Sequence, residues 1–172
     1  TSVPDLMEIK QEPQYIHEAY GTQPGEASFA NNCLLARRLV ERGVRFVQLY
    51  QRGWDMHADG SSAPGMTAMR PLGGQVDHAV SAFLDDVEER GLSDRILLII
   101  TGEMGRNPVL NAKGGRDHWG SLTPLVFAGG GLNMGQVIGQ SDPRGGEAAT
   151  ERFTPQHLLG TIMNTLFDIG RM

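Results

Sequence analysis

The feature that most constrains the fold is the segment Arg95–Thr101, in which five apolar side chains follow one another without interruption. An alternating pattern would leave one face of a strand to water, but a continuous apolar run leaves neither. Strands of this kind are typical of parallel sheets that helices cover on both faces. We therefore predict that this segment is a central strand of an α/β domain.

Helical patterns lie on both sides of this strand. Ser28 can cap a helix over residues 28–42, and Gly43 stands where a C-terminal cap is expected. A second helix is predicted over 71–90, with a solvated outer face that includes Asp86, and a last one from residue 154 onward. The helices have the amphipathic spacing that buries one face against a sheet.

Further strands are predicted at 44–50, 122–128 and 136–139. The resulting order of elements predicts a layered α/β/α fold with a mostly parallel sheet. Three or four strands are few for such a sheet, so we expect a partial domain with further strands upstream of Thr1. Residues 1–27 are predicted to form an extended lead-in arm, and residues 28–172 the domain itself.

Composition excludes several classes of protein. The 172 residues include 20 acidic and 15 basic ones, for a net charge of −5, which argues against a nucleic-acid partner. No apolar run approaches the roughly 20 residues of a membrane span. The single cysteine, Cys33, excludes an internal disulfide framework and is expected to be a buried apolar residue.

Residues suited to chemistry gather in three glycine-flanked loops. Asp55 and His57 follow the first predicted strand, Glu103 follows the central one, and Asp117 and His118 precede the third. Ligands of open α/β sheets bind outside the carboxyl ends of the strands. Because no helical pattern separates Glu103 from the third strand, the chain should return antiparallel to the same edge. We predict that all five residues converge there.

Carboxylates mixed with imidazoles are the ligands of zinc and manganese, and of calcium or magnesium where oxygens dominate. Each short motif alone is more commonly a solvated turn, but the three together favour a divalent metal ion. Asp117 is expected either to bind the ion or to orient His118.

The remaining candidates leave alternatives open. Arg106 is expected either to hold an anion with two hydrogen bonds or to pair internally with Glu103 or Asp117. Trp54 and Trp119 could form an aromatic wall that binds a sugar-like ligand, or could pack against the rest of the protein. No Ser or Thr lies in a recognisable nucleophile turn, so the catalytic nucleophile is unknown.

Four segments together resemble a known family: Ser28–Val47, Gly53–His57, Gly102–Arg106 and Gly115–His118. They resemble the domain of unknown function 1501 family, bacterial proteins often labelled sulfatase-like. The resemblance runs from about Ser2 to Ile169 and covers the C-terminal portion of a typical member. It implies a fold similar to the alkaline phosphatase and sulfatase superfamily, and a periplasmic or secreted location.

The resemblance also implies roles by motif position. Asp55 and His57 resemble the superfamily's first Asp and His, Glu103 the Asp of its next pair, and His118 its last His. Met104 stands where that pair's His would be, and the superfamily's nucleophile belongs to the upstream portion.

The implied function is metal-dependent hydrolysis of sulfate or phosphate esters, for instance of a sulfated or phosphorylated carbohydrate, with no activity in the isolated fragment. The alternative is a non-catalytic anion- or carbohydrate-binding domain with a remnant metal pocket.

Overall fold

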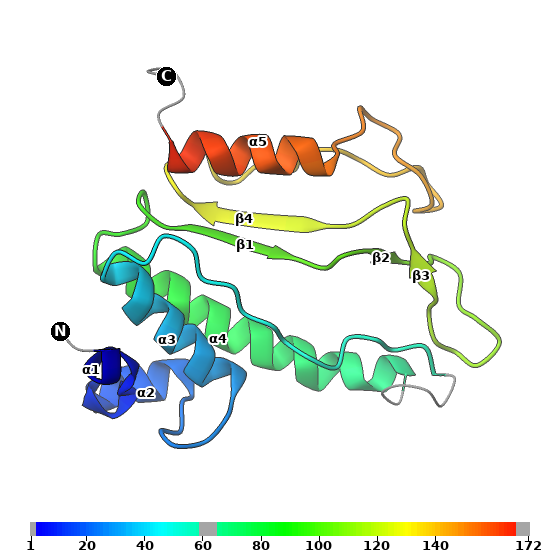
Figure 1. Cartoon of the computed structure of the whole chain (residues 1–172). Coiled ribbons are helices and arrows are strands. Elements are labelled where there is room, and N and C mark those ends of the chain that lie inside the picture. Colours follow the sequence, from blue (N-terminus) through cyan, green and yellow to red (C-terminus); the bar gives the residue numbers. More distant parts are fainter. Residues whose placement is uncertain (1–2, 59–64, 168–172) are drawn as a thin grey trace. The chain divides into compact units, whose positions relative to one another are not determined.

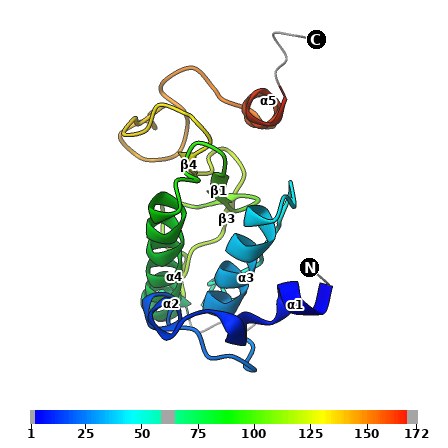
Figure 2. The same ribbon diagram turned by 90° about the vertical axis from the view of Figure 1, so that its left-hand side faces the viewer.

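The computed structural model describes residues 3–58 and 65–167 and divides into two compact units, Thr1–Leu92 and Ser93–Met172. The first unit is helical. Its elements are α1 (Val3–Met7), the 3-10 helix η1 (Ile9–Gln11), α2 (Gln14–Tyr20), α3 (Phe29–Glu41), the 3-10 helix η2 (Gly65–Ala68) and α4 (Met69–Glu89). The long helices α3 and α4 lie side by side, and α2 packs against both (Figures 1 and 2).

Local signals at both ends set the helix α3 where it was predicted. The Ser28 hydroxyl accepts a hydrogen bond from the backbone N–H of Asn31, 3.0 Å away, as an N-cap does. After α3, Gly43 adopts a φ of +89°, the left-handed conformation that glycine provides at a helix end. The predicted helices over 28–42 and 71–90 are thus confirmed as α3 and α4.

The first unit has its own apolar core between α2, α3 and α4. Its buried side chains include Ile16, Tyr20, Cys33, Leu34, Ala36, Ala79, Ala82, Phe83 and Val87. Burial raises the pKa of the Cys33 thiol to about 12, because the surrounding apolar groups cannot stabilise a thiolate. Cys33 is therefore the inert core residue that was predicted.

The second unit holds the strands. β1 (Leu97–Thr101) pairs antiparallel with β4 (Leu125–Gly129), and β2 (Gly105–Arg106) pairs antiparallel with β3 (His118–Trp119). The last helix, α5 (Pro155–Leu166), begins as predicted, with Thr154 as its N-cap and Pro at its first position.

The predicted layered α/β/α fold with a mostly parallel sheet is wrong. In the described residues both sheets have two antiparallel strands, and β1 pairs with β4 alone, so β1 is not a central strand. A parallel neighbour needs a crossover connection, usually helical, whereas residues 102–124 contain no helix. The continuous apolar run of β1 predicts a strand, but it does not specify the direction of the neighbouring strand.

Two further predicted strands do not form. Residues 44–50 and 136–139 have no ladder partner in the part of the chain that the structure describes. Phe46 is 69% exposed and Tyr50 74% exposed. Strand propensity reflects packing on a pleated surface, so apolar and aromatic content predicts a strand only where a partner strand is present.

Candidate functional site

In the first unit, Asp55 and His57 meet on the segment between α3 and η2. The Asp55 Oδ1 lies 2.8 Å from the His57 Nε2. The Met56 N–H donates to the Trp54 carbonyl at 2.9 Å, which makes a three-residue turn centred on Asp55. The His57 side chain is 16% exposed and that of Asp55 is 60% exposed. The pair thus presents a carboxylate to solvent beside a mostly buried imidazole.

In the second unit, the β2–β3 ribbon places Arg106 directly opposite His118. Residues directly opposite each other in an antiparallel pair project from the same face, so the guanidinium and the imidazole share one side of the ribbon. Gly105 is buried, and a Cβ at that position would overlap the Leu122 carbonyl. The close approach of the backbone therefore requires glycine before Arg106.

Asn111 shapes the loop that joins β2 to β3. Its Oδ1 accepts the backbone N–H groups of Lys113 and Gly115, each at 3.0 Å, and its Nδ2 donates to Asp117 Oδ1 at 3.1 Å. Sequence reasoning missed Asn111. A signal was present, because an Asn side chain commonly accepts the backbone N–H two residues on, and Gly114 and Gly115 follow shortly after.

The predicted site residues are divided between the units. Asp55 and His57 belong to the first; Glu103, Asp117 and His118 belong to the second. Within the second unit, the helix-free antiparallel return expected after Glu103 is present, because β3 runs back along β2. The convergence of all five residues on one ion stays a prediction.

The two tryptophans also lie in different units. The Trp119 indole Nε1–H donates to the Gly146 carbonyl at 2.7 Å, which anchors the ring to the loop before α5. This contact favours the packing role for Trp119 over a sugar-binding wall.

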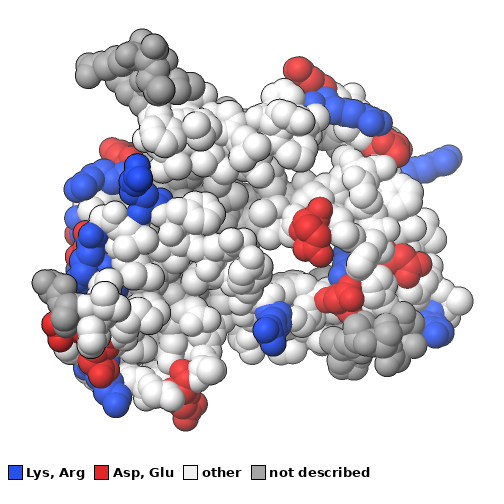
Figure 3. Space-filling model, viewed as in Figure 1, with Lys and Arg blue, Asp and Glu red and all other residues white. Residues whose placement is uncertain are grey.

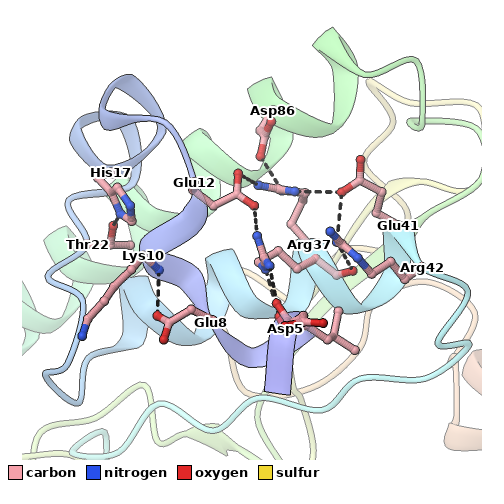
Figure 4. A network of polar contacts seen from close by, with 12 residues as sticks. Asp5, Glu8, Lys10, Glu12, His17, Thr22, Arg37, Glu41, Arg42 and Asp86 are labelled. Atoms are coloured by element: carbon pink, nitrogen blue, oxygen red, sulfur yellow. Dashed lines mark hydrogen bonds and ion pairs between the residues drawn. The ribbon is translucent and has the colours of Figure 1, made fainter. Parts of the chain in front are cut away.

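Sequence reasoning also missed a buried ion network in the first unit (Figure 4). Arg37, only 1% exposed, lies 2.6 Å from Glu12, 2.8 Å from Glu41 and 2.8 Å from Asp86. The contact between the Arg37 Nε and Asp86 is an ion pair without hydrogen-bond geometry. Arg38 pairs with Glu12 and donates to the carbonyls of Asp5 and Leu6.

Asp86 extends this network across α4. It accepts hydrogen bonds from the Tyr20 hydroxyl at 3.0 Å and from the Arg90 Nε at 2.6 Å. The prediction that Asp86 lies on a solvated helix face is therefore wrong, because a partner 66 residues away in the sequence buries it. Burial raises the pKa of the Tyr20 hydroxyl, and the neighbouring Asp86 carboxylate raises it further.

The network pairs its charges internally and serves to hold the unit together. Its three carboxylates belong to Glu12, Glu41 and Asp86, and its four guanidinium groups to Arg37, Arg38, Arg42 and Arg90. Burial opposes ionisation of Glu12, but hydrogen bonds and charges from Arg37 and Arg38 outweigh it and lower the pKa of this carboxyl. Because each charge has its partner within the network, we assign it a structural role.

On the face shown in Figure 3, basic and acidic groups are interspersed. This face therefore does not have the continuous basic patch that is typical of nucleic-acid-binding proteins. Among the described helices, none has the length and apolar character needed to cross a membrane.

Comparison with known proteins points to one family. The model of a family described as "Protein of unknown function (DUF1501)" matches residues 1–168. No curated protein matches the chain, and no solved structure does. The match covers nearly the whole chain and confirms the resemblance found in its motifs, so this chain belongs to the DUF1501 family.

Proposed function

We propose that this chain is part of a divalent-metal-dependent hydrolase that acts on small sulfate or phosphate esters, such as those of carbohydrates. One observation carries the proposal: the Asp55 Oδ1 and the His57 Nε2 lie 2.8 Å apart on one short turn. Carboxylate oxygen and imidazole nitrogen are both ligands of zinc and manganese.

The spacing of the pair fits a metal ion. Zinc-to-ligand bonds of about 2.0 Å at tetrahedral angles place neighbouring ligand atoms about 3.3 Å apart. The Asp55–His57 pair therefore needs to open by only about 0.5 Å to hold an ion between its two atoms. The contact between the Asp55 Oδ1 and the His57 Nε2 already brings the two potential ligand atoms together.

We assign Glu103, Asp117 and His118 as the further ligands, and Arg106 as the residue that binds the anionic group of the ester. A bound ion would polarise the ester oxygen and stabilise the charge that develops on it. The Arg106 guanidinium can hold two oxygens of a planar or tetrahedral anion at once. Support for this part comes from the chemistry of the residues and from Arg106 lying opposite His118.

The test is metal binding by the whole chain, since no nucleophile is assigned and the chain alone is expected to show no ester turnover. Zinc, manganese, calcium and magnesium are added separately, and the thermal unfolding midpoint is followed. A ligand at a hundredfold excess over its Kd stabilises the folded state by about 2.7 kcal/mol. At least one ion should raise the midpoint, and Asp55→Asn, His57→Ala and His118→Ala should each reduce the rise.

A matched control is His78→Ala, which removes an exposed imidazole of α4 that is not a proposed ligand. This variant should respond to metal as the original chain does. Absence of a shift with all four ions would contradict the metal site. Binding of metal without ester turnover in a longer protein would instead favour the non-catalytic anion- or carbohydrate-binding alternative.

We also propose that the protein is exported to the periplasm or secreted. The support is the family resemblance alone. Fractionation of a bacterium that carries the native gene tests it, since the protein should leave the cytoplasmic fraction.

A further inference from the structure

Two arginines, Arg106 and Arg116, bind the backbone at the same end of the β2–β3 ribbon. The Arg106 Nη1 donates to the Arg116 carbonyl at 3.2 Å, and the Arg116 Nη1 donates to the Asn107 carbonyl at 2.7 Å. Each guanidinium is therefore hydrogen-bonded to the backbone at the other arginine or at the residue next to it. Arg116 precedes His118 by two residues, the spacing that returns a side chain to the same face of an extended chain.

The charge of Arg116 is not balanced by a carboxylate. In the described segments 3–58 and 65–167, no Asp or Glu forms an ion pair with it, although its side chain is half-buried. Side chains alternate between the two faces of an extended chain, so the neighbouring Asp117 projects from the face opposite to Arg116. There its Oδ1 accepts a hydrogen bond from the Asn111 side chain. A half-buried guanidinium without a carboxylate is a group that an anion would stabilise.

The ribbon holds both arginines in place before any ligand arrives. The Asn107 N–H donates to the Asp117 carbonyl at 2.8 Å, and the Asn111 N–H donates to the Gly115 carbonyl at 2.9 Å. One Nη of each arginine is hydrogen-bonded to a backbone carbonyl. The two guanidinium groups therefore lose little conformational entropy when they bind an anion.

We propose that Arg106 and Arg116 form one oxyanion site, and that this site prefers the dianion of a phosphate monoester to the monoanion of a sulfate monoester. The inference rests on the proposed function, for which it names the substrate class. The charge of Arg116, which no carboxylate of the described residues balances, adds to the guanidinium fork of Arg106 and favours the more highly charged ligand, whereas a sulfate monoester brings only one negative charge. A phosphate monoester carries its second charge above a pKa of about 6.

The test is an NMR titration of the whole chain with methyl phosphate and with methyl sulfate, in the presence of a chelator. At about pH 8, methyl phosphate should bind about tenfold more tightly, the value of one additional charge-assisted contact. At about pH 5 the phosphate loses its second charge and the preference should disappear. The methyl sulfate titration, whose ligand charge stays constant, reports any change in the protein's own groups.

Variants localise the effect. Arg116→Gln should weaken methyl phosphate binding about tenfold and methyl sulfate binding far less. Arg116→Lys should fall between, because lysine restores the charge but not the fork. The matched control is Arg144→Gln, which removes an exposed arginine from another loop of the same unit and should change nothing.

Equal affinity for the two esters at about pH 8 would overturn the inference, and this comparison needs no variant. An equal loss in Arg144→Gln and Arg116→Gln would overturn it as well. The chelator separates the two proposals: if the metal-dependent rise in unfolding midpoint fails while the phosphate preference holds, only the hydrolase proposal falls. If the midpoint rises but the preference is absent, only this inference falls.

Discussion

At the scale of single residues, Glu12 is expected to contribute strongly to the stability of the first unit. Its carboxylate joins the N-terminal segment to both Arg37 and Arg38 of α3, 25 and 26 residues away in the sequence. Removing one partner of a buried ion pair leaves the other charge buried without compensation.

We expect Glu12→Gln to lower the free energy of unfolding by about 3 kcal/mol, because both arginines lose a charged partner. Urea denaturation measures the change. Glu26→Gln, an exposed carboxylate of the same segment, serves as the control and should change stability by less than about 0.5 kcal/mol. Equal stability of the two variants would show that the network contributes little.

Glu12 also predicts how stability depends on pH. Its pKa in the folded chain is lowered from an ordinary value of 4.5, so the unfolded chain binds the proton more readily. The stabilisation is therefore complete above the ordinary value and is lost as the pH falls through the folded pKa. Urea midpoints at a series of acidic pH values should fall less steeply for Glu12→Gln than for the original chain.

Gly105 has a comparable role in the second unit. A methyl group there would overlap the Leu122 carbonyl, so Gly105→Ala must displace backbone and should destabilise the ribbon by about 2 kcal/mol. Gly120→Ala is the control, because nothing lies within 4 Å of a Cβ at that position. The thermal unfolding midpoint should fall for the first variant and remain unchanged for the second.

At the scale of elements, the start of α3 depends on one hydroxyl. Ser28→Ala removes the hydrogen bond to the Asn31 N–H and should cost about 1 kcal/mol of unfolding free energy. Ser81→Ala makes the same chemical change within α4, where the hydroxyl only contacts the carbonyls of Asp77 and His78. That control should be neutral, and a comparable loss in both variants would argue against the cap.

At the scale of the whole molecule, the two units differ in how they are stabilised. The long helices α3 and α4 share a core, whereas α5 has no buried residue and exposes Leu159, Met163 and Leu166. Segments with few buried contacts open at low free-energy cost. Hydrogen exchange should therefore be fast in the α5 amides and slow in the amides near Leu34 and Phe83. Equal protection in α5 and α3 would contradict this ranking.

Much of the fold could be predicted because it depends on signals within a few residues. The capping hydroxyl of Ser28, the left-handed Gly43 and Thr154 with Pro155 delimit α3 and α5 whatever surrounds them. The apolar run at β1 likewise predicts a strand. Family membership was predictable for the same reason, since the motifs that carry it are short and local.

The tertiary structure alone decided which strands pair and which charges are buried. Segment 44–50 has the composition of a strand, yet β1 pairs with β4 instead, because pairing depends on where the chain returns. Asp86 was predicted to lie on a solvated helix face, but a partner many residues away buries it, and distant partners likewise pair with Arg37 and Arg38. Periodicity and capping act over one or two helical turns, whereas ladder direction and ion pairing depend on the path of the whole chain.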